Sequence, residues 1–136
     1  MSGNVRTQQA ISAYRVASVA VPPAKVIVKL YDGAIVRLER AVLALEARRF
    51  EESFTNVTVA ASILRGLSYN LDFERGGEMA VRLRAMYSRN ILALLRSVGK
   101  PDAVTRFRLI GKGLRDLRDA WSEIAKLPPE SYRNFR

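Results

Sequence analysis

Apolar residues recur every three or four positions along four long segments of the chain, a spacing typical of amphipathic α-helices. The segments cover about residues 23–48, 51–71, 78–98 and 101–127. In the first, the apolar residues follow the heptad rhythm of bundle helices: Ile27, Tyr31, Ala34, Leu38, Ala41 and Leu45. The second and fourth have similar stripes: Phe54, Val57, Ala61, Leu64 and Leu71, and then Ala103, Phe107, Ile110, Leu114, Leu117, Trp121 and Ile124. The pattern predicts four helices that each bury one side.

Proline and glycine residues separate these helices. Three pairs interrupt the apolar pattern: Pro22-Pro23, Gly76-Gly77 and Pro128-Pro129. The short connection at residues 48–50 makes the first two helices antiparallel neighbours. Gly33 stays within the first helix because the apolar period continues through it, and we expect the backbone to pack closely there.

The predicted fold class is therefore all-α. Residues 23–127 form an antiparallel four-helix bundle, and residues 128–136 form a C-terminal tail. Residues 1–22 form a mobile, partly helical N-terminal arm, in which Ile11 and Tyr14 share one side of a helical turn.

The third helix differs from the others because it has two apolar rows on opposite sides. One row consists of Met79, Leu83, Met86, Asn90 and Leu94. The other, here called the second row, consists of Val81, Ala85, Ser88, Leu92 and Leu95. Only one side of a bundle helix faces the core, so three interpretations of the second row compete. The N-terminal arm covers it, two copies of the chain pair through it, or it forms a groove for an amphipathic helix of another protein.

The composition of the chain indicates one soluble domain. The chain has 136 residues, 49% of them apolar, which suits a single core. No apolar run approaches the ~18 residues of a membrane span, and the N-terminus lacks the apolar segment of a signal peptide. We therefore expect a cytoplasmic protein.

The absence of both cysteine and histidine argues against an enzyme. Zinc sites usually contain one or both of these residues, and nucleophilic triads usually need a histidine base. The acidic cluster of Asp116, Asp119 and Glu123 is interleaved with Arg115 and Arg118, which favours a solvated, charge-paired helix face. We expect no catalytic site, no cofactor and no metal.

The net charge is +10, from 23 Lys+Arg and 13 Asp+Glu. Such a charge is compatible with nucleic-acid binding. However, the basic residues are spread along every helix rather than gathered in one stripe, and the chain has no recognition helix or platform of aromatic residues. A basic surface that steers an acidic protein partner fits equally well, and nucleic acid is the less favoured partner.

Two stretches of the chain resemble the flagellin export chaperones, the FliS family. They are PAKVIVKLYDGAI at residues 23–35 and LDFERGGEMA at residues 71–80. The matching residues of these motifs and of the later helices are Leu30, Tyr31, Asp32, Gly33, Leu71, Glu74, Gly76, Gly77, Glu78, Tyr87 and Trp121, and Ile11 and Tyr14 match in the arm. Two features depart from the family. The turn that often holds Gly-Asp is here Arg48-Arg49-Phe50, and the chain is strongly basic.

The resemblance implies a non-enzymatic, cytoplasmic chaperone with a helical-bundle fold. It would bind the disordered C-terminal segment of flagellin, prevent premature polymerisation and deliver the subunit to the flagellar type III export machinery. The second row would form the flagellin-binding groove, the arm with Ile11 and Tyr14 would rearrange, and the other motif residues would be mainly structural. The alternatives are a basic helical module that binds nucleic acid or another regulatory protein, and a homodimer formed through the second row.

Overall fold

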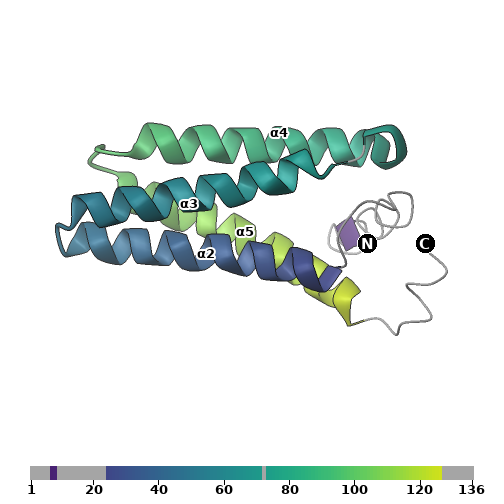
Figure 1. Cartoon of the computed structure of the whole chain (residues 1–136), viewed down its shortest axis with the longest axis horizontal. Coiled ribbons are helices and arrows are strands. Elements are labelled where there is room, and N and C mark those ends of the chain that lie inside the picture. Colours follow the sequence, from purple (N-terminus) through teal and green to yellow (C-terminus); the bar gives the residue numbers. More distant parts are fainter. Residues whose placement is uncertain (1–6, 9–23, 72, 127–136) are drawn as a thin grey trace.

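The computed structural model describes residues 7–8, 24–71 and 73–126. It contains four long helices: α2 (Ala24–Glu46), α3 (Phe50–Tyr69), α4 (Phe73–Ser97) and α5 (Ala103–Ala125). The helices lie side by side and the chain reverses direction at each connection (Figure 1). The predicted all-α four-helix bundle is confirmed.

The helices do not pack equally closely. α2 contacts α3 and α5 along much of its length, and α3 also contacts α4. α4 and α5 contact each other less, and they diverge from the connection that joins them (Figure 1). The position of α4 in the bundle therefore depends mainly on α3 and on contacts across the core.

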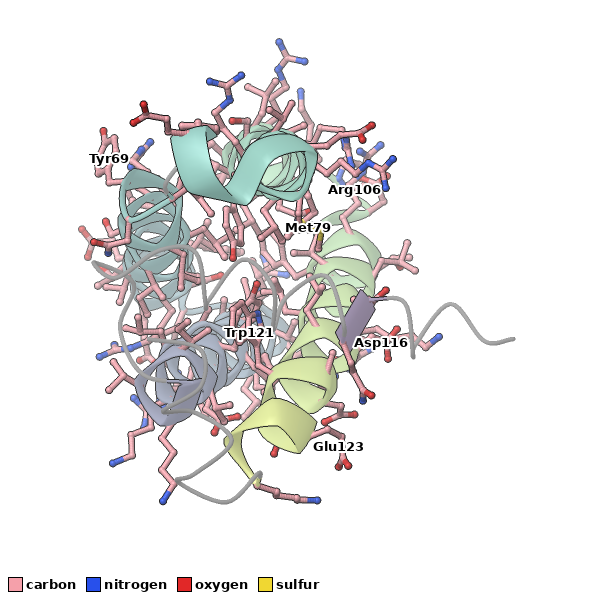
Figure 2. The ribbon with its side chains drawn as sticks, turned by 90° about the vertical axis from the view of Figure 1, so that its right-hand side faces the viewer. Tyr69, Met79, Arg106, Asp116, Trp121 and Glu123 are labelled. Atoms are coloured by element: carbon pink, nitrogen blue, oxygen red, sulfur yellow. The ribbon has the colours of Figure 1, made fainter. Side chains whose placement is uncertain are left out.

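The core contains apolar side chains from all four helices. Its largest fully buried members include Trp121, Tyr31, Tyr87 and Phe107. Figure 2 looks along the bundle and shows Trp121 in the interior, whereas Tyr69, Asp116 and Glu123 point outward. The predicted stripes of α2 and α5 thus face the core, except that the side chain of Ile124 lies outside the described residues.

The prediction that Phe54 belongs to the core stripe of α3 is wrong, because its side chain is 49% exposed. The neighbouring residue Ser53 is buried instead, and its Oγ donates a 2.9 Å hydrogen bond to the carbonyl oxygen of Ala41 in α2. Consecutive residues of a helix point about 100° apart, so a buried Ser53 turns Phe54 toward solvent.

The third helix begins earlier than the sequence pattern predicts. α4 includes Phe73, and its axis kinks at Gly77, where φ is 54° and ψ is −131°. Side chains other than glycine rarely adopt this conformation. The Arg84 guanidinium lies 4.7 Å from the centre of the Phe73 ring, and this contact joins the turn before the kink to the longer helix after it.

α2 ends in a Schellman motif in which an arginine takes the place of the usual glycine. The amide of Arg49 donates to the carbonyl oxygen of Ala44 at 2.7 Å, and the amide of Arg48 donates to that of Leu45 at 2.9 Å. Arg48 has a φ of 61°, which is in the left-handed region. At the end of α4, by contrast, Gly99 adopts φ 78°, as predicted for a residue that follows a helix end.

Ion pairs follow the contact between α2 and α5. Acidic residues spaced seven apart on α2 face arginines of α5 in three pairs: Asp32 with Arg118 at 2.6 Å, Glu39 with Arg115, and Glu46 with Arg108 at 3.2 Å. The side chains are partly exposed, so each pair contributes little to stability, but together they favour one antiparallel register.

Several predictions concern residues that the structure does not describe. Ile11 and Tyr14 lie outside the described residues, as do most of the predicted arm and the C-terminal tail.

Candidate functional site: the outer face of α4

A hydrogen bond across the core helps to hold the side of α4 that faces inward. The hydroxyl groups of Tyr87 in α4 and Tyr31 in α2 are 2.6 Å apart, and both side chains are buried. Burial is the main cause that raises the pKa of Tyr31 to about 12, so this phenol is neutral at physiological pH. Together with the buried side chains around it, this hydrogen bond restricts rotation of α4 about its own axis.

The first row of α4 packs inward on the same side as Tyr87. Leu83 and Leu94 are buried, and Met79 and Met86 are half-buried against the core. Met79 lies on the side of α4 that is turned toward α5 (Figure 2).

The second row points to solvent over its whole length. Val81 is 46% exposed, Leu92 is 48% exposed and Leu95 is 37% exposed. The two residues between them, Ala85 and Ser88, are exposed as well. None of the helices that the structure describes covers this row.

The spacing of the second row is that of a coiled-coil seam. Its members step by four, three, four and three positions, as the a and d residues of a heptad do. Ala85 and Ser88 in the middle are small, so another helix can approach closely there, and the larger side chains at the two ends can act as anchors. The spacing and the apolar character of this row suit contact with one side of an amphipathic helix.

The remaining motif residues have structural surroundings. Leu71 is half-buried against the core, and Gly77 forms the kink. Glu78 is exposed and pairs with Arg82 at 3.2 Å, and Glu74 is also exposed. Leu30 is half-buried against the core, and Gly33 and Gly76 are partly exposed.

Gly33 lies in a helix as predicted, but the predicted close approach of backbones is wrong. A Cβ atom added there would lie 3.5 Å from Cδ1 of Ile63 in α3, which is an ordinary van der Waals distance. The site therefore has room for alanine.

Two further hollows on the described part of the surface were not predicted from the sequence. A groove of about 560 Å³ runs between α2 and α5 and is lined by residues that include Leu38, Val42, Leu43, Phe107 and Lys112. A smaller hollow of about 270 Å³ lies at one end of the bundle and includes Phe50, Phe54 and Val98. The apolar walls of each come from separate helices, so a pattern read along one segment does not reveal them.

Other kinds of site have little support among the described residues. No three His, Cys, Asp or Glu side chains of the described chain gather closely enough to hold a metal ion. No helix in the described ranges has the length and the apolar character needed to cross a membrane.

The described residues form an all-α bundle whose helix α4 exposes an apolar row with the spacing of a coiled-coil seam. Comparison with known proteins identifies the family. The sequence profile described as "Flagellar protein FliS" matches residues 7–128. The chain belongs to the FliS family, a family of chaperones and not of enzymes.

Two curated relatives agree with this assignment. The chain is 32% identical to the "Flagellar secretion chaperone FliS" of Salmonella typhimurium (strain LT2) over 96% of its own length and 98% of that protein. It is also 32% identical to the "Flagellar secretion chaperone FliS" of Campylobacter jejuni (strain 81116), over 75% of the chain and 79% of that protein. The family predicted from the two motifs is confirmed.

Proposed function

We propose that this protein is a cytoplasmic chaperone that binds the disordered C-terminal segment of flagellin. It keeps the subunit from polymerising and delivers it to the flagellar type III export machinery. Membership of the FliS family supports this proposal, as do the names of the two relatives. The observation that carries it is the second row of α4, which is apolar, exposed and spaced to receive a helix.

Simple energetics explain why such a client needs a long apolar surface. Ordering a disordered segment costs roughly 1–2 kcal/mol per residue in backbone entropy. Val81, Leu92 and Leu95 are each about half covered already, so completing their burial contributes on the order of 1 kcal/mol apiece. The second row alone therefore holds only part of the segment.

The groove between α2 and α5 offers a second apolar surface for the same client. Leu43, which is 63% exposed, and Phe107 line this groove. A segment that crosses from one surface to the other would bury both and would be held away from other flagellin subunits. In this proposal the N-terminal arm, with Ile11 and Tyr14, occupies part of the apolar surface until the client displaces it. The action is stoichiometric binding without chemistry on the client.

The test compares two leucines that are exposed on different helices. Leu92→Glu changes the second row, and Leu109→Glu is the control, because Leu109 is 65% exposed on α5. We expect Leu92→Glu to weaken binding of a labelled flagellin C-terminal peptide by at least about 10-fold, since it removes an anchor and buries a charge in the complex. Both variants should melt within a few degrees of wild type, because exposed positions contribute little to stability.

Three results would contradict the proposal. In the first, the flagellin peptide would fail to bind wild type. In the second, Leu92→Glu would bind the peptide as well as Leu109→Glu does. In the third, Leu92→Glu would unfold the bundle. The same samples test the nucleic-acid alternative with a labelled oligonucleotide. Binding governed by phosphates weakens linearly with salt on a log–log scale, whereas burial of apolar anchors responds far less.

A further inference from the structure

The residues beside the seam of α4 carry information about its occupant. When the second row takes the a and d positions of a heptad, three arginines at spacing seven occupy the e position: Arg82, Arg89 and Arg96. We call them the arginine row. In coiled coils the residues at e and g flank the seam, and their charges select the partner helix.

The arginine row is largely free to bind a partner. Arg89 and Arg96 are exposed, and no acidic side chain of the described chain lies within ion-pair distance of either. Arg82 pairs with Glu78 at 3.2 Å, but its side chain remains 72% exposed. On the other flank Arg84 is exposed as well. Beyond Glu78, therefore, the outer face of α4 combines an apolar seam with charges of one sign.

We propose that the flagellin segment that binds α4 is an amphipathic helix with acidic residues beside its apolar side, placed to pair with the arginine row. This inference rests on the proposed function. Residues seven apart in a helix are separated by about 10 Å along its axis. The partner helix must therefore present an acidic residue about every two turns, in register with Arg82, Arg89 and Arg96.

The same charges argue against a second copy of this chain as the occupant. In an antiparallel pair of α4 helices, e positions face e positions, so the arginine row would meet itself. In a parallel pair, e faces g, and the g positions hold Arg84, Ile91 and Val98. Neither arrangement supplies an acid to an arginine. Nucleic acid would supply negative charge but would leave Leu92 and Leu95 without an apolar partner.

The experiment neutralises two arginines in the row and two elsewhere. The variant Arg89→Gln/Arg96→Gln is compared with Arg40→Gln/Arg65→Gln, whose exposed arginines lie on α2 and α3. Both double variants lose two positive charges, so any effect of net charge on peptide binding is the same in the two. Binding of a fluorescent flagellin C-terminal peptide is measured by anisotropy at low and high salt. We expect the α4 variant to bind about 10-fold more weakly at low salt, from about 3-fold per exposed ion pair. Its salt dependence should also be shallower, while the control changes less than about 2-fold.

Designed peptides separate this proposal from the proposed function. One amphipathic peptide carries leucines in a heptad seam with flanking glutamates, and its twin carries lysines in their place. We expect the glutamate peptide to bind wild type, to lose affinity with Arg89→Gln/Arg96→Gln, and to compete with the flagellin peptide. Binding of the glutamate peptide alone, without any binding of flagellin, would support the charge requirement of the surface but would refute flagellin as its client.

Several outcomes overturn the inference. The inference fails if the lysine peptide binds as tightly as the glutamate peptide. It also fails if substituting either pair of arginines weakens flagellin binding equally. The inference would also fail if an oligonucleotide bound wild type more tightly than the glutamate peptide does, and if that binding required Arg89 and Arg96. A further such outcome would be a dimer in sedimentation experiments that the Leu92→Glu substitution dissociates. In the first two cases flagellin binding and the proposed function can still stand.

Discussion

The left-handed arginine at the end of α2 allows a sharp test of the fold. Arg48 has a φ of 61° and occupies the position in a Schellman motif where glycine is usual. A side chain in this conformation costs roughly 1–2 kcal/mol, because Cβ crowds the following carbonyl group. Arg48→Gly removes this cost. It also adds about 0.5–1 kcal/mol of chain entropy to the unfolded state. The substitution should therefore stabilise the protein by about 0.5 kcal/mol.

A matched control makes this small net effect measurable. Arg49 is the next residue and has an ordinary φ of −96°. Arg49→Gly changes the net charge and the unfolded-chain entropy as Arg48→Gly does, but it relieves no strain. It also removes the long, exposed contact of Arg49 with Glu52 at 3.9 Å, which contributes little to stability. We expect Arg49→Gly to destabilise the protein by about 0.5–1 kcal/mol. The two variants should thus differ by roughly 1–2 kcal/mol, the full cost of the left-handed conformation.

The assay is urea denaturation followed by far-ultraviolet circular dichroism. The free energy of unfolding is extrapolated to water, and the slope with denaturant must stay constant across the variants. Arg48→Ala is a third sample. It removes the weak contact of the Arg48 guanidinium with the Phe50 ring, at 5.7 Å, but it keeps Cβ and should not stabilise. If Arg48→Gly is no more stable than Arg49→Gly, the strain and the Schellman motif are both refuted.

Three further predictions concern the core. Gly33→Ala should stabilise the protein by about 0.5–1 kcal/mol, because an added Cβ would lie at an ordinary van der Waals distance of 3.5 Å from Ile63. The control is Gly113→Ala, which has open space around the added Cβ. A loss of stability in Gly33→Ala alone would mean that the contact with Ile63 is tighter. The pKa of Tyr31 is raised to about 12 in the folded protein and is about 10 in the unfolded chain. The contribution of Tyr31 to the free energy of unfolding is therefore complete below pH 10, and roughly 2–3 kcal/mol of it is lost as the pH rises toward 12. Denaturation at several alkaline pH values should show this fall, and Tyr31→Phe should reduce it. Trp121→Ala should cost about 3–5 kcal/mol, whereas Trp121→Phe should cost clearly less, because phenylalanine keeps an aromatic ring in the core. A folded, stable Trp121→Ala would contradict the burial of this residue in the core.

The fold could be predicted because burial imposes a regular spacing on each helix. Tyr31, Phe107 and Trp121 all lie on predicted stripes, and all are buried. The apolar period also kept Gly33 inside a helix, although Asp-Gly on its own suggests a turn. Both rows of α4 were visible in the same way, since opposite sides of one helix can be recognised from spacing alone.

The features that escaped prediction depend on contacts between segments. Phe54 is more apolar than Ser53, yet the serine is buried because its hydroxyl reaches the carbonyl oxygen of Ala41 in α2. The α2–α5 groove exists because Leu43 and Phe107, on separate helices, line one hollow. The conformation of Arg48 follows from the path of the chain between α2 and α3, and arginine itself has no preference for it.

The inward and outward faces of α4 are connected through Tyr87. This helix packs closely on α3 but less on α5, so fewer contacts hold its rotation than hold that of α2. The bond from Tyr87 to Tyr31 therefore matters for where the second row points. The buried side chains of Leu83 and Leu94 hold the same rotation, and a turn of one residue, about 100°, would carry Leu92 out of the seam and bring the arginine row into its place. Under the proposed function, a buried motif residue such as Tyr87 would influence binding without touching the partner. In the proposed function Tyr87 helps to orient the surface, whereas the residues that would contact the partner lie on the opposite side of the same helix.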